Sequence, residues 1–138
     1  MRIIALVVLF VVFCAGGASA GVVARIDISD QTMVVSENGR VLYSWSVSTG
    51  RSPYRTPRGT YRPIRMHEMW YSRKYDMAPM PHSIFFHGGY AIHGTDAISH
   101  LGRPASHGCV RLHPNNARTL FNLVRSHGSG NTRIVLQN

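Results

Sequence analysis

Acidic residues are scarce in this chain. Only 6 of its 138 residues are Asp or Glu, against 15 Lys or Arg, and every basic residue except Lys74 is an arginine. Arginine can grip a carboxylate through two parallel hydrogen bonds, so this surface favours anionic partners. For most of these arginines, solubility alone is a sufficient explanation.

Long apolar runs are absent beyond residue 20. The run at residues 3–14 is shorter than the roughly 20 residues that a membrane-spanning helix needs. Arg2 precedes it and Ala18-Ser19-Ala20 follows it, which is the pattern of a secretory signal peptide. We therefore expect cleavage of residues 1–20 and one exported domain over residues 21–138, without stable membrane insertion, in the periplasm or cell wall.

Cysteine is also nearly absent. Cys14 leaves with the signal peptide, so the mature chain keeps one thiol, Cys109, in an oxidising compartment. An unpaired cysteine there indicates intermolecular pairing or a reactive role. Its glycine- and histidine-rich surroundings argue against an inert, buried cysteine. Export further argues against nucleic acid as the partner and favours the anionic surface of the cell envelope.

The run from His93 to Leu112 carries the candidate chemistry. A thiol at its usual pKa of about 8.5 holds little thiolate at neutral pH, and an imidazole folded back onto the sulfur corrects this by taking the proton. His93 lies sixteen residues before Cys109, far enough for two strands and a turn to bring them together. Gly108 allows close backbone approach, and amides around the cysteine suit the oxyanion of an attacked carbonyl. These features predict acyl transfer.

Two motifs carry a family resemblance. Residues 106–111, Ser-His-Gly-Cys-Val-Arg, preceded by His93-Gly94, resemble the signature of the L,D-transpeptidase catalytic domain (YkuD) family. Residues 56–61, Thr-Pro-Arg-Gly-Thr-Tyr, resemble a second family segment. The resemblance spans nearly all of the mature chain. It implies a mainly β sandwich with one principal helix after the cysteine, and no metal or organic cofactor.

The resemblance also implies an activity, that of a peptidoglycan L,D-transpeptidase. The Cys109 thiolate would attack a stem tetrapeptide, release D-Ala and pass the acyl group to an acceptor amine, giving a 3→3 crosslink; carbapenems would acylate the same sulfur. His93 would be the general base, oriented by the Gly94 carbonyl or, alternatively, by Asp96. Two rivals stay open: hydrolysis of the same thioester by a carboxypeptidase or amidase, and a wall-binding module without activity.

Further site residues are expected around this pair. His107 falls on the same face of an extended chain as the sulfur and is expected to lower the thiol pKa or shape the oxyanion pocket, unless it only packs the loop. Arg111 is equally a clamp for a substrate carboxylate or a structural residue, in a buried ion pair or bonded to loop carbonyls. Ser106 is expected to cap the turn beside the substrate, and Tyr90 and Trp70 to contact it.

A zinc site is the competing interpretation of the same residues. His93, His107, Cys109 and His113 are all suitable zinc ligands. Short paired spacings are missing, however, and a zinc-bound thiolate would lose its nucleophilic role. A metal-free site is therefore preferred.

Hydrophobic patterns predict the other elements. Pro114 begins a helix whose Ala117, Leu120, Phe121 and Val124 share one face. Strands are expected at residues 22–28, 32–36, 41–49, 61–66 (as a central strand), 83–87, 90–93 and 132–136, with an Asn38-Gly39 hairpin turn. In the third of these, the side chains expected to face the core are the larger ones, Val41, Tyr43, Trp45 and Val47.

Residues 67–81 lack a clean period. We expect an irregular loop there, either a flap on the substrate side of the site or a packed surface loop without a role.

Overall fold

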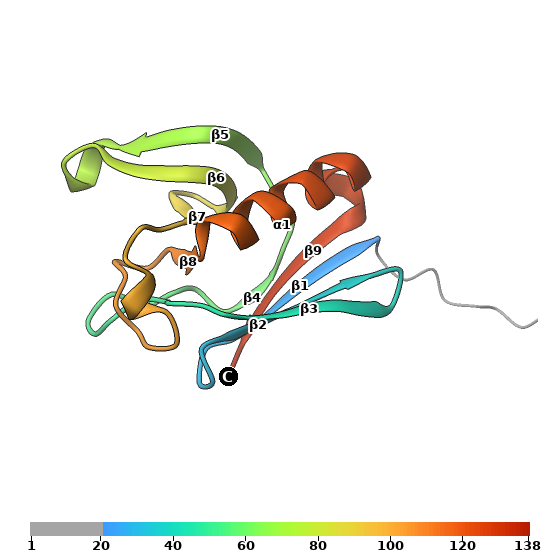
Figure 1. Cartoon of the computed structure of the whole chain (residues 1–138), viewed down its shortest axis with the longest axis horizontal. Coiled ribbons are helices and arrows are strands. Elements are labelled where there is room, and N and C mark those ends of the chain that lie inside the picture. The colour runs from blue at the N-terminus through green and yellow to red at the C-terminus, as the bar shows by residue number, and fades with distance from the viewer. Residues whose placement is uncertain (1–20) are drawn as a thin grey trace, which may run out of the picture.

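The computed structural model describes residues 21–138, so the expected signal peptide lies outside the described residues. This part of the chain forms two β-sheets with one α-helix, α1 (Pro114–His127), between them (Figure 1). The mainly β sandwich with a principal helix after Cys109 is thus confirmed. In the described residues, no helix combines the length and apolar character needed to cross a membrane.

The first sheet contains the chain ends of the described domain. Its order is β3 (Arg40–Ser46), β2 (Thr32–Glu37), β1 (Val22–Asp27), β9 (Thr132–Gln137) and β4 (Gly59–Tyr61). Strands β1 and β9 are parallel, and the other neighbours are antiparallel. Asn38 and Gly39 have φ values of 48° and 81° and join β2 to β3, which confirms the predicted two-residue hairpin turn.

The second sheet carries the segments that matter for function. Its order is β5 (Arg65–Ser72), β6 (Ala78–His87), β7 (Tyr90–Gly94) and β8 (Val110–Leu112). Strands β7 and β8 are parallel, with Ile92 beside Val110 and His93 beside Arg111. Parallel neighbours need a crossover, and residues 95–109, which contain the motif turn, provide it.

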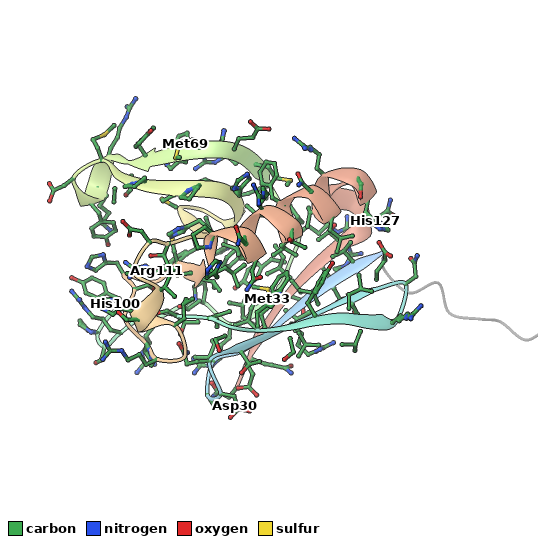
Figure 2. The ribbon with its side chains drawn as sticks, in the orientation of Figure 1. Asp30, Met33, Met69, His100, Arg111 and His127 are labelled. Atoms are coloured by element: carbon green, nitrogen blue, oxygen red, sulfur yellow. The ribbon has the colours of Figure 1, made fainter. Side chains whose placement is uncertain are left out.

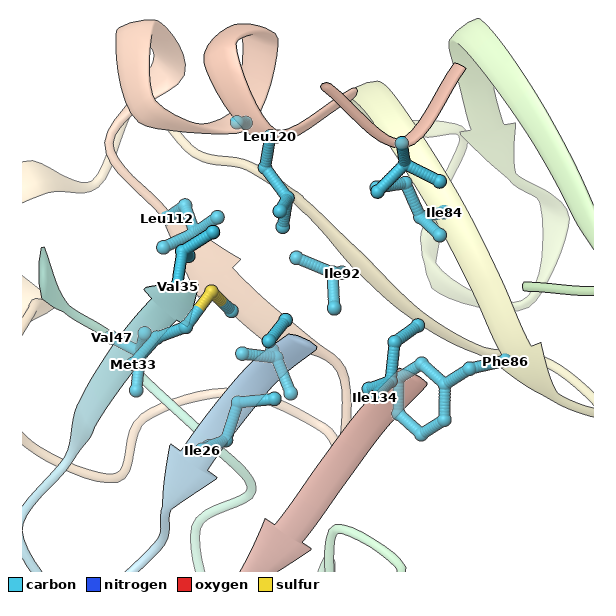
Figure 3. Packing of buried hydrophobic residues seen from close by; sticks show 14 of the residues in the cluster. Ile26, Met33, Val35, Val47, Ile84, Phe86, Ile92, Leu112, Leu120 and Ile134 are labelled. Carbon is cyan, nitrogen blue, oxygen red and sulfur yellow. The ribbon is translucent and has the colours of Figure 1, made fainter. Parts of the chain in front are cut away.

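The core fills the space between the two sheets. Ala117, Leu120, Phe121 and Val124 are buried on one face of α1, as predicted, and the helix contacts β6, β7 and β1. Figure 3 shows Leu120 pointing from α1 into a cluster of side chains from both sheets: Ile84 and Ile92 of the second sheet, and Ile26, Met33 and Ile134 of the first. The helix therefore holds the inner face of the second sheet in place.

The predicted central strand at residues 61–66 is wrong. Strand β4 is a three-residue edge strand that pairs only with β9, and the chain then leaves the first sheet and begins β5 at Arg65. Pro63 lies between the two strands and has no amide to donate to a ladder, so a continuous central strand is not possible there.

The predicted inward face of residues 41–49 is only partly right. Val47 is fully buried and Trp45 packs at the margin of the core, but Val41 is 64% exposed and Tyr43 also lies at the surface, stacked on Trp45. β3 is an edge strand, and a register shift next to Ser36 turns its outer end away from the core. The alternation of large and small side chains therefore predicts burial only at the end of this segment near Val47.

Residues 67–81 are regular, contrary to the prediction. They form most of a β-hairpin, β5–β6, joined by a short 3₁₀ turn at Arg73–Tyr75. Figure 2 shows Met69 on the outer side of this hairpin. Because side chains alternate along a strand, its neighbour Trp70 faces the opposite way, towards the cavity described below.

Candidate active site

His93 lies near the end of β7 on the face opposite the core. Its neighbour Ile92 is buried in the core, and strand alternation turns the imidazole the other way. Nδ1 lies 2.7 Å from the Gly94 carbonyl oxygen, which is the contact expected from the sequence, in place of Asp96. A carbonyl oxygen only accepts, so Nδ1 carries the proton and Nε2 of the neutral ring is free to accept one.

Burial keeps this imidazole neutral. The side chain is 7% exposed, and burial lowers the pKa of His93 to about 4, with the nearby charge of Arg111 acting in the same direction and the bond to Gly94 opposing both. A neutral ring with an unprotonated Nε2 is the form that a general base requires.

Cys109 lies immediately before β8. Ile92 pairs with Val110, so one residue earlier Ala91 stands beside Cys109, on the same face of the sheet as His93. The cysteine packs against a small cluster of Met80, Phe85 and Ala91. Burial raises the pKa of its thiol, while a hydrogen bond from the Ala91 backbone and the charge of Arg111 lower it in part. The resting site therefore holds a protonated thiol and a neutral imidazole on the same face of the sheet.

Ser106 caps the turn that presents Cys109, as predicted. Its Oγ accepts a hydrogen bond from the Gly108 amide at 3.0 Å and donates one to the Cys109 carbonyl at 2.6 Å. The sequence predicts that the amides near Gly108 and Cys109 donate hydrogen bonds to an oxyanion. The Gly108 amide already donates to Ser106, so the Cys109 amide is the remaining donor for an oxyanion.

Gly108 is required by the protein itself. It has φ +122°, and a Cβ at this position would come within 2.6 Å of the Tyr90 ring. We predicted that this glycine lets a substrate approach the backbone, but the space is filled by Tyr90. The Gly108 carbonyl accepts a hydrogen bond from Thr56 Oγ1 at 2.8 Å, which fixes the turn from its other side.

The segment after β3 supports the turn. Backbone hydrogen bonds of 3.1 and 2.8 Å join Ser48 to Arg111, and the Thr49 carbonyl accepts from the amides of both Ala105 and Ser106 at 3.0 Å. The Arg51 amide donates to the Ser106 carbonyl at 2.9 Å. The first sheet thereby positions a turn whose cysteine belongs to the second.

Cys109 and His93 open into one cavity of about 770 Å³, a volume typical of sites for small molecules and peptides. The other predicted side chains that line it are Trp70, Tyr90, Ser106, His107 and Arg111. Gly94 is not a lining residue, because it packs against Pro114 at the start of α1 and against Pro81. The β5–β6 hairpin also lines the cavity, which places the predicted flap on the substrate side.

His107 holds the hairpin against the motif turn. Its ring stacks on Tyr75 with centroids 4.2 Å apart, contacts Tyr54 edge-on at 4.9 Å, and lies 3.2 Å from Nη2 of Arg51. Desolvation lowers the pKa of His107, and the charges of Arg51, Arg111 and Lys74 lower it further. These contacts support the packing alternative for His107 over an effect on the thiol.

Arg111 presents an unused charge to the cavity. The ion pairs within residues 21–138 join Arg125 to Glu68 and His127 to Glu37, so Arg111 takes part in neither. Burial lowers the pKa of its guanidinium, and the charge of Asp96 partly offsets this. Figure 2 shows Arg111 beneath the hairpin. The structural ion pair considered for Arg111 is not present.

The residues proposed as zinc ligands do not gather in one place. In the described part of the chain, no three His, Cys, Asp or Glu side chains are grouped as a metal site requires. His113 instead caps α1, where its Nδ1 accepts from the Asn115 amide at 3.1 Å.

Several cavity residues were not among the predicted site residues, and the aromatic and basic side chains of Arg65, Tyr75 and Phe85 are examples. None of these three belongs to a motif. The available signal was the concentration of aromatic and basic side chains in residues 65–75, which was interpreted as loop composition.

Comparison with known proteins identifies the fold. Among the similar solved structures is an L,D-transpeptidase from Mycobacterium smegmatis, with 25% sequence identity and a TM-score of 0.77 over 86% of this chain and 59% of that one. An L,D-transpeptidase from Xylanimonas cellulosilytica has 30% identity and a TM-score of 0.73 over 88% of this chain and 62% of that one. The LD transpeptidase LdtMt1 in complex with imipenem has 22% identity and a TM-score of 0.76 over 85% of this chain and 59% of that one. The chain spans about three fifths of the length of these structures. No curated protein matches it.

A family model gives the more specific result. The model of the L,D-transpeptidase catalytic domain (YkuD) matches residues 21–135, which include both motifs and every cavity residue named above. By this match, the chain belongs to the L,D-transpeptidase catalytic domain family.

Proposed function

We propose that the protein is a peptidoglycan L,D-transpeptidase in which Cys109 is the nucleophile and His93 the general base. One observation supports the proposal: a neutral imidazole, whose Nδ1 carries the proton and donates it to the Gly94 carbonyl, lies on the same sheet face and in the same cavity as the single cysteine of residues 21–138. A neutral imidazole on the same face of the sheet as the thiol supports activation of the cysteine by a general base.

The first half-reaction forms a thioester. Sγ of Cys109 attacks the carbonyl of the diamino acid at position three of a stem tetrapeptide as its proton passes to Nε2 of His93. Because the resting thiol is protonated, this transfer accompanies the attack and does not precede it. The Cys109 amide holds the oxyanion. When the C–N bond breaks, His93 returns the proton to the leaving amine of D-Ala.

The second half-reaction transfers the acyl group. An acceptor amine attacks the thioester carbonyl and gives its proton to His93. The C–S bond then breaks, the sulfur regains a proton, and a 3→3 crosslinked product leaves. The charged residues that line the cavity are mostly basic, which suits peptide carboxylates: they are Arg65, Arg73, Lys74 and Arg111, against Asp76 and Asp96.

The proposal is tested by intact-mass analysis after incubation with imipenem, the ligand found on the similar LdtMt1 fold. We expect the parent protein to gain the mass of one inhibitor and Cys109→Ala to gain none. Ser126→Ala, at an exposed position on α1, is the matched control and should be acylated like the parent. An unmodified parent, or a modified Cys109→Ala, would contradict the assignment.

Transfer and hydrolysis share the first half-reaction and differ in their products. Incubation with a stem tetrapeptide should give a crosslinked dimer if an amine resolves the thioester, and tripeptide alone if water does. We expect the dimer. Tripeptide as the sole product, at every acceptor concentration, would make the protein a carboxypeptidase.

The place of action is proposed from the sequence. Residues 1–20 would direct export, and the excess of 14 basic over 6 acidic residues in residues 21–138 would hold the mature protein at the anionic envelope. The N-terminal residue of the protein recovered from cells should be Gly21. Recovery of an uncleaved chain from the cytoplasm would rule out this location.

A further inference from the structure

The guanidinium of Arg65 packs against two aromatic rings, those of Phe85 and Trp70, which we call the aromatic corner. This corner lies on the opposite side of the cavity from β8, the strand of Arg111. Arg65 begins β5, and its Cζ lies 3.5 Å from the centre of the Phe85 ring and 4.6 Å from that of Trp70. The two rings meet at 78°, with centroids 5.6 Å apart. One ring therefore lies under the guanidinium and the other beside it, an arrangement that stabilises a cation through the ring faces.

Strand register aligns this corner with the sulfur. Arg65 pairs with Phe85, and Phe85 with Ala91, which in turn stands beside Cys109. Cross-strand partners share a face, so the four residues form one row across the second sheet. With a strand spacing of about 4.8 Å, a guanidinium above Phe85 lies roughly 10 Å from the strand of Cys109.

The hydrogen-bonding edge of Arg65 is mostly unused. Nη1 lies 3.1 Å from Nε2 of His67, which accepts from it because a guanidinium only donates. No ion pair within residues 21–138 includes Arg65; the nearby Glu68 pairs with Arg125 instead. A guanidinium with stacked faces, a free edge and no carboxylate partner is arranged to bind a carboxylate through two hydrogen bonds.

We propose that Arg65, held by Phe85 and Trp70, is the residue that binds a carboxylate of the stem peptide and so determines which peptides are accepted. This inference rests on the proposed function. Two carboxylates of the peptide are within reach of a site roughly 10 Å from the strand of the sulfur: that of the terminal D-Ala and that on the side chain of the diamino acid. Both offer the same chemistry to Arg65.

Binding in the Cys109→Ala background separates this inference from the catalytic one, because no turnover is needed. Dissociation constants are measured by NMR titration for three tetrapeptides: the free acid, the C-terminal amide, and the peptide with its diamino-acid side-chain carboxylate amidated. Adding Arg65→Met should weaken binding of the free acid by about 10- to 100-fold, as expected for a charge-assisted hydrogen-bonded pair. One of the two amidated peptides should lose this sensitivity, and that peptide identifies the carboxylate.

Two further variants control for charge and folding. Arg118→Met removes an equal charge from an exposed position on α1 outside the cavity and should leave all three constants unchanged. Arg65→Lys keeps the charge but not the two-bond geometry and should give an intermediate loss. In the parent cysteine background, alkylation by neutral iodoacetamide should be equally fast with and without Arg65→Met, which shows an intact site.

The inference is overturned if Arg65→Met binds the free acid as tightly as its parent, if both amidated peptides remain as sensitive to Arg65 as the free acid, or if Arg118→Met causes the same loss. Failure of imipenem to acylate Cys109, with the Arg65 dependence of binding intact, would instead overturn the proposed chemistry and leave the carboxylate site standing.

Discussion

The two faces of the second sheet differ in composition and role, although the same strands form both: one face belongs to the apolar core and the other lines the cavity. On the inner face, Ile92 and Val110 are buried against α1 and the first sheet. On the outer face, His93 and Arg111 sit beside each other in the cavity. Apolar packing on one side fixes the strand positions, and strand alternation then sets the spacing of polar groups on the other. Stability and chemistry should therefore respond to different substitutions.

The largest expected effect lies on the cavity face. His93→Gln keeps the approximate size of the side chain but cannot take the thiol proton, so kcat/KM for the stem peptide should fall by about 10²- to 10⁴-fold. The melting temperature should stay close to that of the parent. Kinetics and a thermal melt on the same preparation test this, and a fall in activity matched by loss of fold would refute the separation of the two faces.

The inner face should show the reverse. Leu120→Ala leaves a cavity at the centre of the core and should lower the free energy of unfolding by about 2–5 kcal/mol. Urea unfolding measures the loss. In the folded fraction, the rate of Cys109 acylation by imipenem should be unchanged. A large drop in that rate without destabilisation would mean that α1 acts on the site directly.

The pH dependence of stability sharpens the contrast. The pKa of His93 is lowered to about 4 in the folded protein, so between pH 6.5 and 4 the unfolded chain binds the additional proton. Stability should therefore be lost as pH falls through this window, by up to about 3 kcal/mol from this group. In His93→Gln, the part of the pH dependence that comes from this imidazole should be absent. Parallel pH profiles of unfolding for the two proteins would contradict the burial of a neutral imidazole.

The smallest effect is expected at the turn between the faces. Gly108→Ala meets both an unfavourable φ and the Tyr90 ring, whereas Gly102→Ala, at φ +96°, meets nothing within 4 Å. Strain alone costs about 1–3 kcal/mol. Gly102→Ala should be destabilised to that extent in urea and Gly108→Ala somewhat more, because of the Tyr90 ring, and only Gly108→Ala should also slow acylation of Cys109. Equal acylation rates would show that Tyr90 does not constrain the turn.

The sequence predicted what local patterns encode. The helical period of Ala117, Leu120, Phe121 and Val124 identified α1, and Asn38-Gly39 identified its hairpin. Of the motif around the cysteine, Ser106, His107, Cys109 and Arg111 line one cavity together with His93. These features depend on neighbours within a few positions of the chain.

What the sequence did not predict depends on contacts between distant strands. The β5–β6 hairpin carries apolar and aromatic side chains on both faces, so it shows no alternation between apolar and polar positions. The exposure of Val41 accompanies a register shift in the pairing of β3 with β2, which leaves Leu42 without a partner. The alignment of Arg65 with Phe85 and Cys109 follows from three successive strand pairings, none of which leaves a local pattern.

The account depends on an acyl group carried by the Cys109 sulfur. Rapid quenching during turnover of a stem tetrapeptide, followed by peptide mapping, measures this directly. We predict one tripeptide acyl group on Cys109, formed with release of one D-Ala and absent in Cys109→Ala. Release of D-Ala by Cys109→Ala, or turnover by the parent with no acyl group on this sulfur, would contradict it.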